Sequence, residues 1–371
     1  MAISTIQPYI PQQAGALPVL ARPTAAKPRV FFGGQNNNIK VMSYNCQRFY
    51  RTNSGRLYKP KHKIADLGKI IRQEDPDILC LQEVGDERML REFNERHLNG
   101  AYTTIIAGHS SNRHEPYGSH VAILAKPGFT PRQTKNHSRV RFSLPPQIYR
   151  FRDHEYSSPR WEYVEASHPI LEVGFEDPNG NPLTVVNAHF KATVTSGKRA
   201  DYQTTLQQSA AQRLQEARIV ARIVEQTKEE SPNTDIIVAG DLNSDAERKE
   251  DAPVIRKLAG LPGNTPKENV TPPTRSQIRR APLLREPFLT QGGYGLPDGA
   301  LDTYRSGARR HKLDYMWLSP ETFKRIESFR VVGKMPDRFY ANASDHLPIT
   351  VEYAPKPVAT QFTGSRLNKI A

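Results

Sequence analysis

Six short clusters of polar residues occur along the chain, in the order S-Y-N, L-Q-E-V, N-A-H-F, G-D-L-N-S-D, L-D-Y and S-D-H-L-P-I, from Asn45 to His346. Each cluster follows or interrupts a short apolar run, a pattern typical of a sheet that holds polar groups at one edge while its body is buried. Asp, Glu, Asn and His together are the groups that a phosphate ester and a hard metal ion require. No single cluster is diagnostic, so the prediction rests on the ordered set.

The hexapeptide at 240–245 follows the apolar run I-I-V-A. Gly240 permits a tight exit from a strand, and Asp241 and Asn243 share one side of an extended backbone because side chains alternate. A carboxylate and an amide on one face can position a water molecule and donate to a phosphate oxygen. The alternative is a turn stabilised by side-chain hydrogen bonds to its own backbone. We predict that Asp241 and Asn243 are catalytic.

Two further clusters supply a carboxylate and an imidazole. Asp345 and His346 stand side by side just before the apolar run I-T-V-E-Y, and imidazole suits proton transfer near neutral pH. Asp314 interrupts another apolar run, where an unpartnered carboxylate would be costly. We predict that Asp314 orients His346 and that both are catalytic. A turn Asp beside a surface His, with Asp314 satisfied on an edge strand, is the alternative.

Glu83 ends a buried strand in L-Q-E-V and is suited to be the single carboxylate ligand of a Mg²⁺ ion. Asn45 closes the preceding apolar run and could hydrogen-bond a metal-bound water or Glu83. Helix capping by Glu83 and a turn role for Asn45 are the alternatives. His189, at the end of another apolar run, could protonate a leaving oxygen, and Asn187 would share its face as a substrate-binding donor. A lone histidine at a strand end is usually structural, so His189 gains weight only from the other clusters.

The elements that must position these groups are strands alternating with helices. Apolar runs predict strands at 39–45, 77–84, 102–108, 120–126, 169–176, 182–190, 235–241, 311–319, 328–333 and 349–354, whereas helical periodicity predicts helices at 62–73, 86–97 and 204–226. Hairpins with intervening helices favour an α+β fold, with sheets packed face to face and helices outside. Residues 127–168 and 260–300 are Pro-rich and basic, and we expect them to form long functional loops.

Composition narrows the class of protein. The chain has 371 residues, 37% of them hydrophobic, a mean hydropathy of −0.64 and a net charge of +14, which favours a polyanionic partner. We expect one domain at 38–354, a disordered arm at 1–37 and a basic tail at 355–371. The arm lacks the pattern of a secretory signal, and no apolar run is long enough to span a membrane. Cys46 and Cys80 are predicted to be buried thiols. We expect a cytoplasmic monomer, with export through a non-classical N-terminal signal left open.

Taken together, the clusters resemble the endonuclease/exonuclease/phosphatase superfamily, which has the DNase I-like fold, and the stretch Thr303-Tyr304-Arg305 before L-D-Y is similar to its bacterial members. The resemblance covers about residues 38–354 and rests on Asn45, Glu83, His189, Asp241, Asn243, Asp314, Asp345 and His346. It implies a four-layer α/β-sandwich, with two packed mixed β-sheets flanked by helices, and Mg²⁺-dependent cleavage of a phosphate ester, with Mn²⁺ as the alternative ion. It also implies that Glu83 is the main metal ligand, assisted by Asn45 and Asp345. A histidine at the position of His189 is similar to DNase I-like nucleases, sphingomyelinases and inositol phosphatases, and it disfavours abasic-site endonucleases, which usually have Tyr there.

Three classes of function remain open from the sequence. The first is a nuclease acting on DNA or RNA, because basic and aromatic residues interleave between 135 and 163 and a basic cluster precedes Asp314. The residues predicted to bind its substrate are Asn187, Arg305, Arg309, Arg310, Lys312, Arg150 and Arg152. The second is a phosphoinositide phosphatase or a sphingomyelinase-like lipid phosphodiesterase on the same scaffold. The third is a non-catalytic binding protein, which the complete set of acidic and imidazole groups disfavours.

Overall fold

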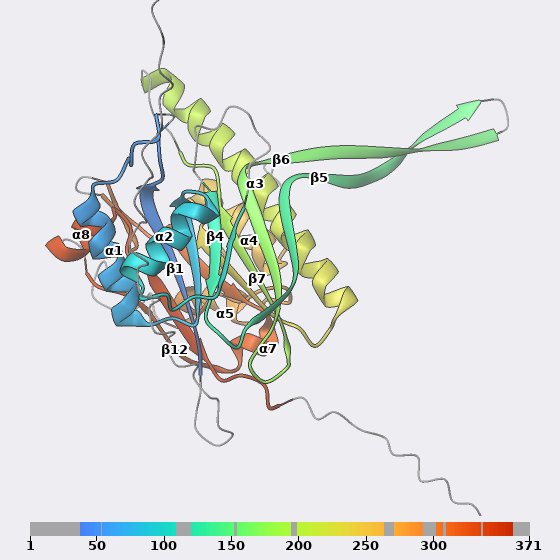
Figure 1. Cartoon of the computed structure of the whole chain (residues 1–371). Coiled ribbons are helices and arrows are strands. Elements are labelled where there is room, and N and C mark those ends of the chain that lie inside the picture. Colours follow the sequence, from blue (N-terminus) through green and yellow to red (C-terminus); the bar gives the residue numbers. More distant parts are fainter. Residues whose placement is uncertain are drawn as a thin grey trace, which may run out of the picture.

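The computed structural model describes residues 38–52, 54–108, 120–151, 154–193, 199–262, 271–291, 302–306, 309–334 and 337–358. The predicted arm at 1–37 and residues 359–371 of the predicted tail lie outside this part of the chain. Two β-sheets lie face to face, and helices cover the outer face of each (Figure 1). The predicted four-layer α/β-sandwich is therefore confirmed.

The first sheet has six strands and is mixed, because β1 is parallel to β2 and antiparallel to β13. Its spatial order is β12 (Ile326–Val331), β13 (Ile349–Tyr353), β1 (Ile39–Phe49), β2 (Ile78–Val84), β4 (His120–Ala125) and β3 (Thr104–Ala107).

The second sheet has five strands, of which β7 and β8 are parallel and the other neighbours are antiparallel. Its order is β11 (Asp314–Leu318), β8 (Asp235–Asp241), β7 (Pro182–His189), β6 (His154–Glu176) and β5 (Thr130–Phe151). A separate two-stranded hairpin is formed by β9 (Tyr304–Ser306) and β10 (Arg309–His311).

Apolar side chains on the helices bury the outer faces of the sheets. The first sheet is covered by α1 (Lys61–Glu74), α2 (Glu87–His97) and α8 (Arg338–Ala343), and the second by α3 (Arg199–Glu230), α4 (Ala252–Ala259) and α5 (Arg275–Arg279). Three shorter helical turns are η1 (Lys249–Asp251), α6 (Pro287–Gln291) and α7 (Pro320–Phe323). A third apolar cluster lies between the sheets and joins Val41 and Cys80 of the first to Val185 and Ile237 of the second.

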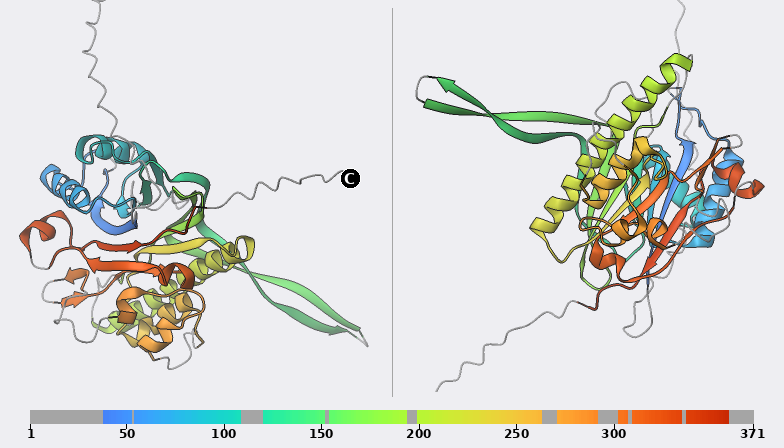
Figure 2. Two further views of the ribbon diagram at one scale, coloured as in Figure 1. Left: turned by 90° about the horizontal axis from the view of Figure 1, so that it is seen from below. Right: turned by 180° about the vertical axis from the view of Figure 1, so that it is seen from behind.

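The predicted loop at 127–168 is wrong. Most of it forms the long antiparallel hairpin of β5 and β6, which projects from the body (Figures 1 and 2). From here on, the arm means this projecting β5–β6 hairpin and not residues 1–37. Its prolines suggested a loop, but Pro145 and Pro146 lie where the pairing register shifts between Leu144 and Gln147, so an irregularity in the ladder accommodates them. Within 260–300 the described part contains the short helices α5 and α6, and residues 263–270 and 292–300 lie outside the described residues.

Most other predicted elements are confirmed with shifted ends. The helix predicted at 204–226 extends over Arg199–Glu230, and the strand predicted at 311–319 begins only at Asp314. Cys46 and Cys80 are free and buried, as predicted. Among the described residues, no helix combines the length and apolar character needed to cross a membrane.

Candidate active site

The period-two alternation of the strands brings the polar clusters to one edge of the space between the sheets. In β1, Val41 faces the second sheet, and Asn45 continues that face four residues later. In β8, Ala239 faces the first sheet and Asp241 follows it two residues later. The same alternation applies to His189 in β7. The predicted residues are therefore polar continuations of an apolar stripe.

Strand direction then aligns three of these side chains. His189 and Asp241 are register partners at the ends of the parallel strands β7 and β8, and Asp314 begins the antiparallel β11 directly opposite Asp241. Gly240 makes this close approach possible, because a Cβ atom there would lie 1.8 Å from the carbonyl oxygen of Ala188. The alternation and the register together explain why groups far apart in sequence meet here.

Asp241 is at the centre of the candidate site and is almost fully buried. Its Oδ2 atom accepts a hydrogen bond of 3.0 Å from Asn45 Nδ2, and its Oδ1 atom accepts one of 2.9 Å from the backbone N–H of Asn243. Imidazole Nε2 atoms of His189 and His346 each lie 3.6 Å from Oδ2. Burial raises the pKa of Asp241 and nearby Asp314 adds to this, whereas the two histidines oppose it.

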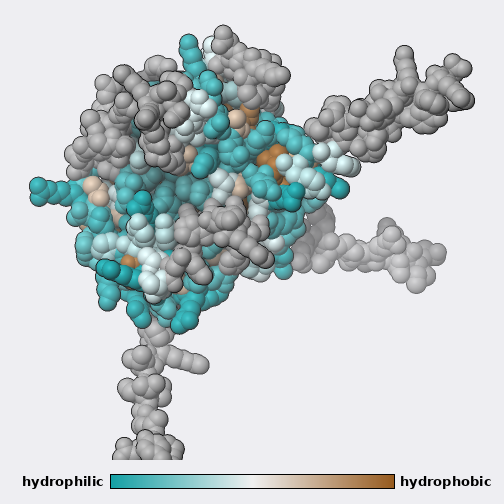
Figure 3. Space-filling model, turned by 90° about the horizontal axis from the view of Figure 1, so that it is seen from above, coloured by the Kyte–Doolittle hydropathy of each residue, from teal (hydrophilic) through white to brown (hydrophobic). Residues whose placement is uncertain are grey.

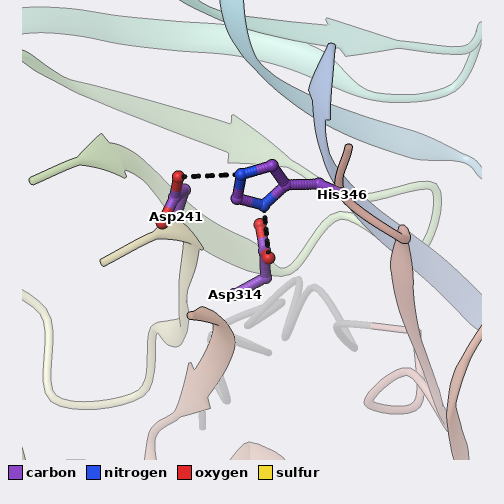
Figure 4. A group of neighbouring side chains, drawn as sticks. All are labelled: Asp241, Asp314 and His346. Atoms are coloured by element: carbon purple, nitrogen blue, oxygen red, sulfur yellow. Dashed lines mark hydrogen bonds and ion pairs between the residues drawn. The ribbon is translucent and has the colours of Figure 1, made fainter. Parts of the chain in front are cut away.

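His346 and Asp314 form the predicted pair (Figure 4). His346 Nδ1 donates to Asp314 Oδ2 at 2.8 Å, and the opposite ring nitrogen points toward Asp241. Burial alone would lower the pKa of His346, but the carboxylates of Asp314 and Asp241 outweigh it and raise the pKa to about 10. The imidazole is therefore held in its charged form at neutral pH.

The loop that carries His346 is fixed against the first sheet. Ser344 Oγ donates to the carbonyl of Asn45 at 2.7 Å and accepts from the backbone N–H of His346 at 3.2 Å. The buried Lys59 donates to the carbonyl of Ala343 at 2.7 Å. The position of His346 thus depends on contacts with β1 and with the segment that follows it.

Glu83 reaches the same edge through an irregular backbone. Its φ of +55° lies in the left-handed region that non-glycine residues rarely adopt, and the pairing register of β2 shifts between Gln82 and Val84. Its carboxylate accepts hydrogen bonds from Asn45 Nδ2 at 3.1 Å and from the backbone N–H of Arg48 at 2.8 Å. Burial would raise the pKa of Glu83, but His189, these two hydrogen bonds and His346 together lower it.

Glu83 and Asp345 fit a divalent metal ion. Both are partly buried acids, and burial followed by the charge of Glu83 raises the pKa of Asp345. Since the charge of Glu83 disfavours ionisation of Asp345, a cation between the two carboxylates would stabilise them. The donors are oxygen atoms, which Mg²⁺ and Mn²⁺ prefer. Asn45 already donates its amide hydrogens to Glu83 and Asp241, and its oxygen accepts from the backbone N–H of Gln47.

A second group of possible ligand atoms comprises Asp241, Asp314 and His346, all within 4.8 Å of one another. A histidine must be neutral to bind a metal ion. Since the pKa of His346 is raised to about 10 and its Nδ1 atom bonds Asp314, this group fits a hydrogen-bonded proton relay better than a metal site.

His189 is held by a histidine that sequence analysis assigned no role. Its ring stacks on His168 with centroids 4.2 Å apart, and His168 Nδ1 donates to the His189 carbonyl at 3.2 Å. Burial, followed by the charge of His189, lowers the pKa of His168 well below its usual value. The Nδ1 atom of His189 is buried without a hydrogen-bond partner in the described part of the chain. Nothing in the spacing of His168 indicated this contact.

Asn187 and Asn243 are close to the edge, but their amide groups donate hydrogen bonds to backbone carbonyls of other segments. Asn187 donates both amide hydrogens across the sheets, to the carbonyls of Leu81 at 2.9 Å and Ala122 at 2.8 Å. This leaves no donor for a substrate, so the predicted substrate contact of Asn187 is not retained. Asn243 has a φ of +47° and donates one amide hydrogen to the Phe190 carbonyl at 3.0 Å, so a second amide hydrogen remains.

Lys312 is also placed differently from the prediction. Its ammonium group lies 4.3 Å from the ring centres of both Phe288 and Tyr315, and it donates to the backbone carbonyl of Asp314 at 3.0 Å. Burial lowers its pKa, although Glu286 and Asp314 oppose this. Lys312 therefore supports Asp314 from behind rather than standing free for a substrate.

The other predicted basic residues are less fully described. Arg305, Arg309 and Arg310 belong to the β9–β10 hairpin, whose Tyr304 has its ring centre 4.7 Å from that of His346. The Arg150 backbone lies in β5, and Arg152 lies outside the described residues. Beside the hairpin is a cavity of about 910 Å³ with Asp245, His311 and Lys312 in its lining. Viewed from above, the molecule shows a largely hydrophilic surface that is hollowed near its centre (Figure 3).

Solved structures confirm the fold. This chain is similar to TDP2 from C. elegans, with 16% identity and a TM-score of 0.50. The match covers 86% of this chain and 76% of the TDP2 chain. The human Nocturnin catalytic domain, solved with a bound sulfate anion, matches over 85% of this chain and 94% of its own, with 16% identity and a TM-score of 0.51. An endonuclease/exonuclease/phosphatase from Bacteroides vulgatus matches over 86% and 99%, with 15% identity and a TM-score of 0.50. No curated protein shows significant sequence similarity.

The sequence itself matches a family model over residues 42–346, which include every residue of the candidate site. That model describes the Endonuclease/Exonuclease/phosphatase family, whose members are metal-dependent hydrolases of phosphate esters. Because the match covers more than half of the chain, the protein belongs to the Endonuclease/Exonuclease/phosphatase family.

Proposed function

We propose that the protein is a Mg²⁺-dependent phosphodiesterase that hydrolyses DNA or RNA. The observation that carries this proposal is the position of Asn45. Its single amide nitrogen donates to Glu83 at 3.1 Å and to Asp241 at 3.0 Å, and so joins an acidic pair suited to a metal ion with an aspartate that faces two histidines. A phosphodiester between the two groups would meet charge stabilisation on one side and proton transfer on the other.

Glu83 and Asp345 would hold the metal ion, with Mn²⁺ as the alternative to Mg²⁺, and Asn45 would fix the direction of the Glu83 carboxylate. When bound, the ion neutralises developing charge on the phosphate oxygens. The depressed pKa of Glu83 keeps this carboxylate ionised at neutral pH, so the ligand is ready without the loss of a proton.

Asp241 would orient the attacking water and accept its proton. Its Oδ2 atom lies 3.6 Å from the Nε2 atoms of both imidazoles, and burial raises its pKa, which makes it a stronger base than an exposed aspartate. The charged His346, oriented by Asp314, would donate from Nε2 to a phosphate oxygen. His189 would donate to the leaving oxygen, and Asn243 has one amide hydrogen left for the phosphate.

A nucleic acid is favoured as substrate by the net charge of +14 and by the exposed arginines and aromatic rings of the arm. A non-catalytic role is disfavoured, because burying two carboxylates beside two imidazoles is costly unless function maintains them. We also propose that residues 38–354 act as one domain and that the protein is monomeric.

The proposal is tested by incubating the protein and Mg²⁺ with single-stranded DNA, plasmid, RNA, a phosphoinositide and sphingomyelin. We expect cleavage of nucleic acid and a loss of about 10³-fold in the His346→Ala protein. His62→Ala is the matched control, because His62 is exposed on α1. Release of phosphate or choline phosphate from the lipids, with nucleic acid left intact, would replace this function by the lipid alternative.

A further inference from the structure

The arm projects past the catalytic edge of its sheet. Pairing of β6 with β7 ends at Leu171 and Asn187, two residues before the end of β7 at His189. The part of β6 that precedes this point continues beyond the edge, paired only with β5 (Figures 1 and 2). The base of the arm is attached directly to the site, because His168 in β6 stacks on His189.

The two faces of this base differ sharply. On one face Val164 is buried in the core beneath α3, and Val140 and Phe142 pack beside it. The side chains that point to the other face are exposed, at positions 139, 141, 161, 163 and 165. Trp161 is 49% exposed and Tyr163 is 55% exposed, although rings of this size are usually covered.

The exposed face carries two cation–ring pairs and one carboxylate, which we call the Arg–aromatic ladder and define as Trp161, Arg141, Tyr163, Arg139 and Glu165. The guanidinium of Arg141 lies 4.2 Å from the ring centre of Trp161, and that of Arg139 lies 4.4 Å from the ring centre of Tyr163. Arg139 also pairs with Glu165 at 3.4 Å. The two pairs thus form a short row in which each ring has one guanidinium over it and remains about half exposed to solvent.

Such a row matches an unpaired nucleic-acid strand. Every base has a flat face that stacks on an aromatic ring or a guanidinium, and the strand brings one negative phosphate per base. The ladder supplies two cations against one carboxylate, and holding the rings in place reduces the entropy lost on binding. A paired duplex would keep its bases stacked on each other and gain only the phosphate contacts.

The distance from the site suits a single bound strand. Tyr163 and Trp161 pair with Arg141 and Ser143 of β5, which lie three and five residues beyond Ser138 at the bulge that contains His168, and at about 3.3 Å per residue this is about 10 Å and about 17 Å. At about 3.4 Å per nucleotide, a substrate strand spans this in about three to five nucleotides, or fewer when extended.

We propose that the Arg–aromatic ladder binds unpaired nucleotides of a substrate strand whose scissile phosphate lies between His189 and His346. This inference rests on the proposed nuclease function and adds a preference for single-stranded or locally unpaired substrates. A membrane surface fits the ladder less well, because each ring is paired with a guanidinium group rather than with a further apolar side chain.

Binding is measured first, by fluorescence anisotropy of a labelled twelve-residue oligothymidylate in EDTA, so that no cleavage occurs. We expect Trp161→Ala and Tyr163→Ala each to weaken binding about tenfold, whereas Tyr163→Phe retains it because the ring remains. Replacing both Arg139 and Arg141 by Ala should reduce the slope of log affinity against log salt by about 1.4, at about 0.7 for each lost phosphate contact.

Arg132→Ala is the matched control, since Arg132 is exposed on the same strand but pairs with Glu176 at the opposite end of β5. This variant should bind the oligonucleotide as the wild-type protein does. Cleavage is then compared for the twelve-residue strand and a dinucleotide too short to reach the ladder. We expect the ratio of kcat/KM between them to fall about tenfold in Trp161→Ala and to stay constant in Arg132→Ala.

The outcomes separate this inference from the proposed function. Wild-type affinity in both alanine variants, or equal losses on long and short strands, would overturn the ladder even if nuclease activity is found. Weakened binding in a protein without nuclease activity would overturn the catalytic assignment and leave the ladder as a single-strand binding surface. Binding of anionic phosphatidylglycerol vesicles that depends on Trp161, with none to the oligonucleotide, would replace the nucleic acid by a membrane.

Discussion

The catalytic edge and the Arg–aromatic ladder use polar groups in opposite ways. At the edge, Asp241 and Asp314 are buried, and hydrogen bonds from Asn45 of the opposite sheet and from His346 fix their positions. On the ladder, Arg139 and Arg141 are exposed, and the contacts found among the described residues are with rings and one carboxylate on the same two strands. Desolvation strengthens charge effects where bonds are broken, whereas exposure allows contact with strands of any sequence. We therefore expect large effects at the edge and graded effects on the ladder.

The largest effect is expected from Asp241→Asn. The amide keeps the shape of the side chain but cannot accept a proton from water, so kcat should fall about 10³-fold while the melting temperature changes little. Glu95→Gln, an exposed change of the same chemistry on α2, should leave both unchanged. Activity near that of the wild type in Asp241→Asn would remove the proposed base.

A smaller loss is expected from Asn45→Ala, which frees both carboxylates that the amide now holds. We expect metal affinity and activity to fall about 10- to 100-fold, the usual cost of losing a group that orients a metal ligand. Calorimetric titration with Mg²⁺ or Mn²⁺ measures this directly. Unchanged affinity would mean that Glu83 needs no support from Asn45.

The pH dependence of the unfolding free energy tests whether the buried edge holds a charged His346. The folded-state pKa of His346 is raised to about 10, above the value of about 6.5 in an unfolded chain, so its stabilisation is fully present below pH 6.5 and is lost as the pH rises toward 10. Asp314→Asn removes the main cause. The difference in unfolding free energy between the two proteins, measured by urea denaturation in EDTA, should narrow between pH 6.5 and 10. A constant difference would contradict a charged His346.

The smallest effect is expected from Glu165→Gln on the ladder. Removing the one carboxylate from this face frees Arg139 and reduces repulsion of phosphates, so binding of the oligonucleotide should tighten about twofold. The measurement is the same anisotropy titration, with Glu95→Gln as the control. Weaker binding would show that Glu165 holds Arg139 in its binding position.

The sequence predicted the grouping of side chains at the catalytic edge better than it predicted the structure of the β5–β6 arm, and the difference has a physical reason. Alternation along apolar strands continues the buried stripe to Asn45 on the first sheet and to Asp241 and Asp314 on the facing second sheet, so their meeting could be inferred from order and spacing. The arm has no second apolar face to produce such a pattern, and its prolines suggested a loop. The pairing of β5 with β6 tolerates Pro145 and Pro146, because its register shifts at that point.

Contacts between segments that are remote in sequence could also not be predicted from the sequence. His168 reaches His189 from the neighbouring strand β6, and Lys312, which looked like a substrate contact, packs between two rings behind Asp314. Asn187 shares the face of His189 as predicted, but the opposite sheet takes its donors. These roles depend on distances between segments that are remote in sequence.

The central claim, that Glu83 binds a divalent metal ion required for cleavage of a phosphodiester, is tested most directly by a Mg²⁺ titration of strand cleavage. The wild-type protein and Glu83→Gln are stripped with EDTA and assayed on the twelve-residue oligonucleotide as Mg²⁺ is restored. We predict that the stripped wild-type protein is inactive and recovers with Mg²⁺, whereas Glu83→Gln needs a concentration about 100-fold higher or more. Cleavage that persists in EDTA, or the same Mg²⁺ dependence in both proteins, would contradict the account.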